Sequence, residues 1–237
     1  MDKQQKIVSM FDEIAPTYDV ANRVLSFGID KQWRKKACDK TFSLKKDVET
    51  ITDIACGTGD LLLFWKDSAT KQKVDVQNYI GVDPAQKMLD IAKQKVDFAE
   101  FKQGKAQDLP LEDSSSDIIS ISYGIRNVVD RVDALKEFYR VLKPGGMVVI
   151  LEFTKQEKRG FVSGFTDLYT KKILPAVGGM ISKNYEAYRY LPDSIEDFLT
   201  AQMLIEELEE VGFDHRYTKS FSFGISTLLI AQKPQQK

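Results

Sequence analysis

The sequence predicts a single α/β domain built on a doubly wound, mostly parallel sheet. From about residue 50 to residue 153, short apolar segments typical of buried strands alternate with segments of helical periodicity. Such alternation indicates parallel strands joined by right-handed helical crossovers. Two further alternating segments near the end of the chain are typical of an antiparallel hairpin.

Residues 1–47 are expected to form helices that precede the sheet and act as a lid. Apolar side chains recur at helical spacing in the first segment, at Ile7, Met10, Phe11 and Ile14. Pro16 interrupts that helix because it lacks a backbone donor. A second helical stretch surrounds Trp33.

Residues 48–153 are expected to carry the five parallel strands and the ligand. The expected strands are 51–55, 79–82, 98–101, 118–122 and 147–153. Helices are expected after the glycine loop C-G-T-G-D, after Asp83-Pro84, and at 134–142. The last of these is closed by K-P-G-G, a sequence that stops helices.

Residues 154–192 break the alternation with an insert that is rich in aromatic residues and glycine. Residues 193–237 are then expected to hold a helix at 194–211 and hairpin strands at 213–221 and 226–231. This completes a single domain over 1–237, with a Rossmann-like sheet of seven strands and helices on both faces. Ligands of such sheets bind at the carboxyl ends of the strands, near the switch in strand order.

Composition narrows the classes of partner. Lys plus Arg is 34 and Asp plus Glu is 35, so the net charge gives no support for a nucleic-acid partner. The start lacks the apolar segment of a signal peptide, and no apolar run is long enough to span a bilayer. A cytoplasmic location is therefore expected.

Cys38 and Cys56 form neither a metal spacing nor a disulfide framework, so no metal is expected. His215, the only histidine, is expected at the surface.

The loop D-I-A-C-G-T-G-D favours a nucleoside without phosphates. Gly57 and Gly59 directly follow the first strand, where glycine lets the backbone approach a ligand closely. A dinucleotide fingerprint needs a glycine or alanine where this chain has Leu62, which disfavours a nicotinamide oxidoreductase. Asp83, at the end of the second strand, is placed to accept hydrogen bonds from both ribose hydroxyls. S-adenosylmethionine is such a ligand.

The ordered motifs resemble those of class I S-adenosylmethionine-dependent methyltransferases, and more specifically the ubiquinone/menaquinone biosynthesis C-methyltransferase family. The matching blocks cover nearly the whole chain: FDEIAPTYDVANRVLSFGIDKQWRK, DIACGTGDL, YGIRNVVD, RVLKPGGMVVILEF, YRYLPDSI and SFGISTLLIAQK. The resemblance implies S-adenosylmethionine as cofactor and methylation of a ring carbon of a polyprenyl quinol, with demethylmenaquinol as the expected acceptor. The choice between benzoquinol and naphthoquinol stays open. The alternatives are a methyltransferase for another small phenol, amine or sterol, and a non-catalytic cofactor-binding module.

The resemblance also implies the cofactor contacts. They are the loop residues Gly57, Thr58 and Gly59, with Asp83, Lys105, Ala106 and Ser122. Each has a structural alternative, since Thr58 could be a turn residue, Asp83 a helix cap and Ser122 a packed hydroxyl. Asp108 either bonds the adenine amino group or caps a turn before Leu109.

Arg126 and Asn127 follow the fourth strand and are expected to act on the acceptor. Both can donate hydrogen bonds, and a donor near a phenolic oxygen favours the phenolate, which enriches the neighbouring ring carbon in electrons. A water polarised between Arg126 and a carboxylate is the expected base, with Tyr18 or Asp19 completing the site. The alternative is an ion pair that braces the loop, with one of two aspartates as partner, Asp117 or Asp130.

A prenylated acceptor implies contact with the membrane, peripherally at its inner face. Two surfaces are candidates, because apolar groups beside lysines suit docking onto anionic lipid. One is the insert, with Phe161, Phe165, Leu168, Tyr169, Lys171, Lys172, Ile173 and Leu174. The other surrounds Val24, Leu25 and Phe27, next to Trp33. Alternatively these residues pack on the sheet or in a homodimer interface.

Overall fold

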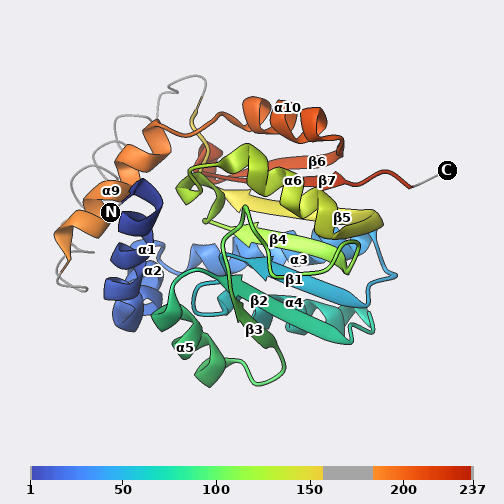
Figure 1. Ribbon diagram of the computed structural model, residues 1–237, viewed down its shortest axis with the longest axis horizontal. Coiled ribbons are helices and arrows are strands. Elements are labelled where there is room, and N and C mark those ends of the chain that lie inside the picture. The colour runs from blue at the N-terminus through green and yellow to red at the C-terminus, as the bar shows by residue number, and fades with distance from the viewer. Residues whose placement is uncertain (1, 157–183, 236–237) are drawn as a thin grey trace.

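The computed structural model describes residues 2–156 and 184–235, which include a seven-stranded sheet in the order β3-β2-β1-β4-β5-β7-β6 (Figure 1). The strands are β1 Thr50–Ile54, β2 Asn78–Asp83, β3 Glu100–Gln103, β4 Ser116–Ser122, β5 Leu142–Glu152, β6 Asp214–Phe221 and β7 Ser226–Gln232. Strands β1 to β5 pair in parallel, whereas β7 pairs antiparallel with both β5 and β6. The predicted doubly wound sheet and its terminal hairpin are confirmed.

Helices cover both faces of the sheet because successive side chains of each strand point to opposite sides. Met147, Val149 and Leu151 join one core with the apolar sides of α3 (Ile29–Leu44) and α4 (Asp60–Gln72). Val148 and Ile150 join a second core with α6 (Arg131–Val141) and α10 (Ala201–Val211). The sheet is therefore the middle layer of a three-layer molecule (Figure 1).

The remaining helices gather at the carboxyl ends of the parallel strands (Figure 1). They are α1 Lys3–Ile14, α2 Tyr18–Leu25, α5 Gln86–Lys95 and α9 Tyr185–Glu196. A third apolar cluster joins all four, with Ile14, Ala21, Met88 and Tyr188 among its members. Pro16 ends α1 as predicted, in the short 3-10 turn η1 (Ala15–Thr17), so that α2 turns away from α1. The expected lid is thus held over the strand ends by apolar packing.

Two expectations about element bounds were wrong. The expected helix at 194–211 is divided into α9 and α10, because Thr200 caps α10 by accepting a hydrogen bond from the Met203 amide and the Leu199 carbonyl accepts one from the Lys155 amide. Strand β5 begins at Leu142 rather than at residue 147, and the pairing register with β4 shifts across the K-P-G-G sequence. Residue 192, the expected end of the insert, lies inside α9. The division of the chain into segments stays a prediction.

Candidate active site

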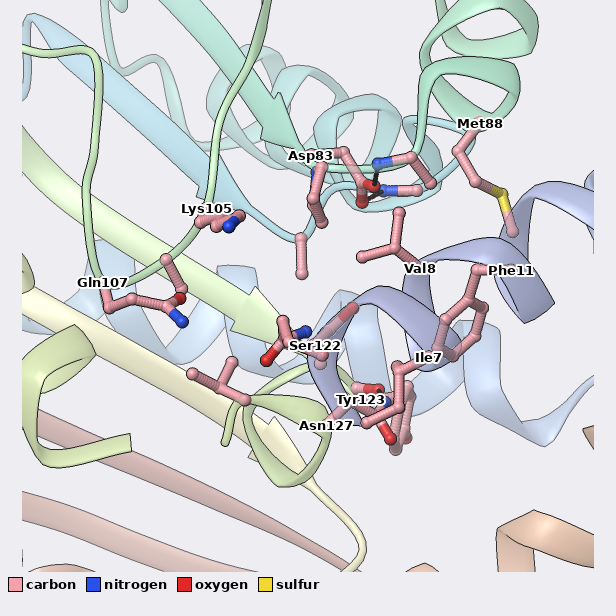
Figure 2. A pocket seen from close by; sticks show the side chains of 18 of the residues that line it. Ile7, Val8, Phe11, Asp83, Met88, Lys105, Gln107, Ser122, Tyr123 and Asn127 are labelled. Atoms are coloured by element: carbon pink, nitrogen blue, oxygen red, sulfur yellow. Dashed lines mark hydrogen bonds between the residues drawn. The ribbon is translucent and has the colours of Figure 1, made fainter. Parts of the chain in front are cut away.

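A cavity that is partly open to solvent, with about 680 Å³ of empty space, lies at the carboxyl ends of β1, β2 and β4, beneath α1. This is where the strand order reverses, since β2 and β4 flank β1 on opposite sides. Its lining includes Gln4, Ile7, Val8 and Phe11 from α1, and Ala55, Gly57, Asp83, Met88, Lys105, Ala106, Gln107, Ser122, Tyr123 and Asn127 from the sheet side. Figure 2 shows Asp83 and Met88 on one side of this space and Ser122, Tyr123 and Asn127 on the other.

The glycine loop approaches the cavity through Gly57. Gly57 has φ of 55°, and a Cβ at this position would meet nothing within 4 Å, so the backbone faces open space. Gly59 instead faces the protein, because its Cβ would lie 3.0 Å from Val96 Cγ2. Of the two predicted loop glycines, Gly57 lines the cavity and Gly59 allows close packing of α4 on the segment after α5.

Asp83 is buried at the end of β2, where two backbone amides hold its carboxyl group. The Ala85 amide donates to Oδ1 and the Gly57 amide donates to Oδ2, each at 2.8 Å. Burial raises the pKa of Asp83 to about 6 despite these two bonds. Each carboxylate oxygen has a second acceptor position. The capping role and a ribose-binding role are therefore compatible.

Residues 105–107 form the wall opposite the α1 side of the cavity. Lys105, Ala106 and Gln107 all line it, as does Ser122. Asp108 is exposed and lies outside the lining, and its amide donates to the Lys105 carbonyl at 3.1 Å. The backbone of Asp108 therefore closes a turn, and its side chain is not brought to the cavity.

Thr58 and Asp19 lie together, but they do not line the cavity. Thr58 Oγ1 donates to Asp19 Oδ1 at 2.7 Å, and Lys95 Nζ donates to Asp19 Oδ2 at 2.7 Å. Lys95 also pairs with Asp60 at 2.6 Å, and Arg23 pairs with both Asp60 and Asp30. Although burial opposes it, the hydrogen bond from Lys95 lowers the pKa of Asp60. We call these five charged residues, Asp19, Arg23, Asp30, Asp60 and Lys95, the lid ion network.

Asp19 consequently binds the glycine loop to α2 and is not brought to Arg126. The expectation that Asp19 completes the acceptor site lacks support in this geometry, whereas Tyr18 does line the cavity. Burial raises the pKa of Tyr18, against the opposing effects of the Asn22 hydrogen bond and of the Arg34 and Arg126 charges. Tyr18 is thus an un-ionised phenol within electrostatic range of Arg126.

Arg126 forms an ion pair with Glu152, and this corrects the expected bracing partners. Its Nη1 donates to Glu152 Oε1 at 2.6 Å, and the Arg126 and Glu152 side chains are 7% and 0% exposed. Asp117 lies at the start of β4 and pairs with Lys143 instead. Burial raises the pKa of Glu152, while the Arg126 charge and hydrogen bonds to the carboxyl group oppose that shift. Glu152 was not predicted from the sequence, although it is an acidic residue at the end of a strand, and the same pattern identified Asp83.

Asn127 lines the cavity, and its side chain makes one hydrogen bond. Its Nδ2 donates to the Tyr123 carbonyl at 3.4 Å, which uses one of the two N–H groups of the amide. Its Oδ1 is buried and has no hydrogen-bond partner within residues 2–156 and 184–235. The expected donor role of Asn127 toward the acceptor stays a prediction.

The remaining observations concern His215, metal binding and the lining residues that were not predicted. His215 is exposed on β6, as predicted, with Nε2 2.6 Å from Thr218 Oγ1. In the part of the chain that the structure describes, no group of three or more His, Cys, Asp or Glu side chains could hold a metal ion. The sequence missed the α1 lining residues Gln4 and Val8 and the strand-side residue Gln107, because helical periodicity does not say which face covers a ligand.

Proteins of known family resemble this chain in sequence and in fold. A profile of the ubiE/COQ5 methyltransferase family matches residues 1–233. The chain belongs to this family. It is 56% identical over 235 residues to the ubiquinone/menaquinone biosynthesis C-methyltransferase UbiE of Campylobacter jejuni serotype O:6, covering 98% of this chain and 100% of the relative. It is 41% identical to the demethylmenaquinone methyltransferase of Thermus thermophilus, covering 95% and 100%.

Solved structures extend the likeness to the fold. A Thermotoga maritima protein described as an S-adenosylmethionine-dependent methyltransferase and possible histamine N-methyltransferase superposes with a TM-score of 0.61. It is 18% identical, and the alignment covers 96% of this chain and 99% of that one. The [4+2]-cyclase SpnF gives a TM-score of 0.69 at 16% identity, with 98% and 97% covered. The fold is that of the class I methyltransferases, and the family makes this protein a methyltransferase.

Proposed function

We propose that this methyltransferase transfers the methyl group of S-adenosylmethionine to a ring carbon of a polyprenyl quinol, with demethylmenaquinol as the expected acceptor. One observation carries the proposal. A single cavity has a buried carboxyl group, Asp83, on one side and a phenol and two amide groups, those of Tyr18, Asn127 and Gln107, elsewhere in its lining. The relatives named for quinone methylation support the same acceptor class.

The Asp83 side of the cavity fits a nucleoside. Asp83 retains free acceptor positions for ribose hydroxyls, and Gly57 leaves room because a Cβ there would point into open space. Met88, Pro84 and Val8 supply apolar surface for a purine, and Ala106 lies on the opposite wall. We propose that these residues hold S-adenosylmethionine, with Lys105 and Ser122 beside them. The bound cofactor supplies an electrophilic methyl group, so the remaining residues have to align and activate the acceptor.

Arg126 is proposed to favour the phenolate form of the quinol. A cation next to the phenolic oxygen stabilises the negative charge that spreads to the ring carbon during methyl transfer. Arg126 stays protonated and is therefore a donor, not a base. Tyr18 and Asn127 are proposed to orient the hydroxyl groups, while α1 excludes water from above.

A methyl-transfer assay tests this function. Purified protein, S-adenosylmethionine carrying a labelled methyl group, and either demethylmenaquinol or its demethylated benzoquinol counterpart are incubated under reducing conditions. We expect label on a ring carbon of at least one quinol, found by mass spectrometry of the extracted product. Label on neither quinol, with S-adenosylmethionine binding intact by calorimetry, would refute the quinol assignment and leave the other small acceptors.

Peripheral contact with the membrane is the expected way for this enzyme to reach a prenylated acceptor. No helix in the described part of the chain is long and apolar enough to cross a bilayer. Of the expected N-terminal surface, Phe27 is 86% and Val24 46% exposed, but Leu25 and Trp33 are buried in the core. Val20, 59% exposed one turn before Val24, extends this surface. The expected insert surface, including Phe161 and Phe165, lies outside the described residues.

Sedimentation with liposomes tests the contact. We expect the protein to sediment with anionic, quinone-loaded liposomes at low salt, and the double variant Val20→Ser, Val24→Ser to sediment less. Val132→Ser is the matched control, since Val132 is 42% exposed and belongs to α6 rather than to α2. Equal sedimentation of all three proteins would exclude the α2 surface as the docking site.

A further inference from the structure

Glu152 holds both the side chain and the backbone of Arg126. It ends β5 and is completely buried. Arg126 Nη1 donates to Oε1 at 2.6 Å, and the Arg126 amide donates to Oε2 at 3.3 Å. The Phe153 amide donates to Oε1 at 2.8 Å. One carboxylate therefore fixes the short turn η2 (Ile125–Asn127) and the guanidinium that projects from it.

The other contacts of Arg126 leave one part of the guanidinium available. Nε donates to Ser194 Oγ on α9 at 3.2 Å, and Nη1 also donates to the Tyr123 carbonyl at 3.0 Å. The guanidinium carbon lies 5.5 Å from the centre of the Phe153 ring, which stacks on Tyr123. Among the residues that the structure describes, Nη2 makes no hydrogen bond. Arg126 is thus held at Nε and Nη1, directly beside the cavity-lining residues Tyr123 and Asn127.

We propose that Glu152 is a positioning residue for methyl transfer, which holds the Arg126 charge beside the cavity so that it can stabilise the phenolate form of the acceptor. This inference rests on the proposed function. Neither Glu152 nor Arg126 lines the cavity, but Tyr123 and Asn127, on either side of Arg126, do. Glu152 contacts Arg126, so its effect on the cavity passes through Arg126. An arginine side chain has many rotamers, and a donor that is already oriented stabilises developing charge without reorganising during the reaction.

A double-mutant cycle tests the proposal with demethylmenaquinol as acceptor. We expect Glu152→Gln to lower kcat by about tenfold or more while the Kd for S-adenosylmethionine stays within about twofold. Glu152→Asp keeps the charge but withdraws the carboxylate by one methylene, and it should also lower kcat. Because Glu152 acts through Arg126, the double variant Arg126→Ala, Glu152→Gln should be no slower than Arg126→Ala alone.

The chain offers a matched control in a second arginine–glutamate pair. Arg131 donates to both Glu207 oxygens at 2.6 and 2.7 Å, and its guanidinium carbon lies 5.5 Å from the centre of the Phe198 ring. The contacts resemble those of Arg126, but the Arg131 and Glu207 side chains are more exposed, at 22% and 20%. Glu207→Gln should leave kcat unchanged. Thermal unfolding of every variant shows that the protein measured is folded, and Glu152→Asp replaces Glu152→Gln if the latter unfolds.

Several outcomes would overturn the inference. A kcat within twofold of wild type in folded Glu152→Gln would do so, as would multiplicative losses in the double variant or an equal loss in Glu207→Gln. A wild-type protein that methylates neither quinol would overturn the proposed function and this inference together. An active wild type with an unaffected Glu152→Gln variant would overturn the inference alone.

Discussion

At the scale of single residues, burial decides how the site groups can act. Asp83 and Glu152 are both buried carboxyl groups at strand ends, yet their surroundings differ. Asp83 is held by two neutral backbone amides and faces the cavity, whereas Glu152 is paired with a guanidinium behind it. Desolvation raises the pKa of each carboxyl group, but only Glu152 has an opposite charge in contact. Asp83 therefore has no counter-ion in contact, and its pKa is raised to about 6.

We expect the affinity for S-adenosylmethionine to fall as the pH falls through about 6. The pKa of Asp83 is raised to about 6 in the free protein, and hydrogen bonds from ribose hydroxyls favour the charged form. The binding contribution is thus present above this pH and lost below it. Calorimetry between pH 5 and pH 8 measures the effect, and Asp83→Asn should bind weakly with little pH dependence. A variant as pH-dependent as wild type would contradict this assignment.

Arg126→Ala should lower turnover about a hundredfold or more while the affinity for S-adenosylmethionine stays nearly constant, because the lost donor serves the acceptor. The change also leaves Glu152 buried without its counter-ion, which should lower the free energy of unfolding by about 3–5 kcal/mol. Arg126→Lys, which keeps a positive charge, separates the two effects. Normal turnover of folded Arg126→Ala at saturating quinol would return Arg126 to a purely bracing role.

At the scale of elements, charged and apolar contacts hold the lid differently. Apolar packing joins α1, α2, α5 and α9, while the lid ion network connects α2 to the glycine loop and to the end of α5. Its members come from segments as far apart in sequence as Asp19 and Lys95, which lie 2.7 Å apart at their charged atoms. The network fixes α2 beside the cavity without lining it.

Lys95→Ala should loosen α2 without unfolding the domain. Two partly buried ion pairs, with Asp19 and Asp60, are lost, and we expect the free energy of local opening of α2 to fall by about 1 kcal/mol. Amide hydrogen exchange measures this as faster exchange in α2. Lys71→Ala is the control, because Lys71 also lies in the last turn of a helix but pairs within it, with Asp67. Equal exchange in both variants would mean that the network does not hold α2.

At the scale of the whole molecule, two apolar layers on either side of one sheet carry the stability. The central strands β1, β4 and β5 are buried on both faces, and each layer joins strand side chains to helices from distant parts of the chain. The layer with α6 and α10 brings the C-terminal helix against the same strands whose ends form the site. Rigidity of the site therefore depends on the packing of both layers.

Phe138→Ala should lower the free energy of unfolding by about 3–5 kcal/mol, because a fully buried ring in the α6 layer is replaced by a cavity. Urea denaturation measures the change. Phe223→Ala is the matched control, since Phe223 is 88% exposed, and it should change stability by less than about 0.5 kcal/mol. Similar losses of unfolding free energy in the two variants would mean that packing in the α6 layer contributes no more to stability than an exposed side chain does.

The sequence by itself determined the sheet, the terminal hairpin and the family, because strand periodicity, glycine turns and motif order are local properties. Only the tertiary structure decided which side chains meet. In the folded chain, Lys95 donates a hydrogen bond to Asp19, Arg126 pairs with Glu152, and the Asn127 side-chain amide donates to the Tyr123 carbonyl. Each contact depends on the relative placement of segments distant in sequence or on the direction of one side chain at a turn. Local pattern does not encode these, since packing of the whole chain fixes them.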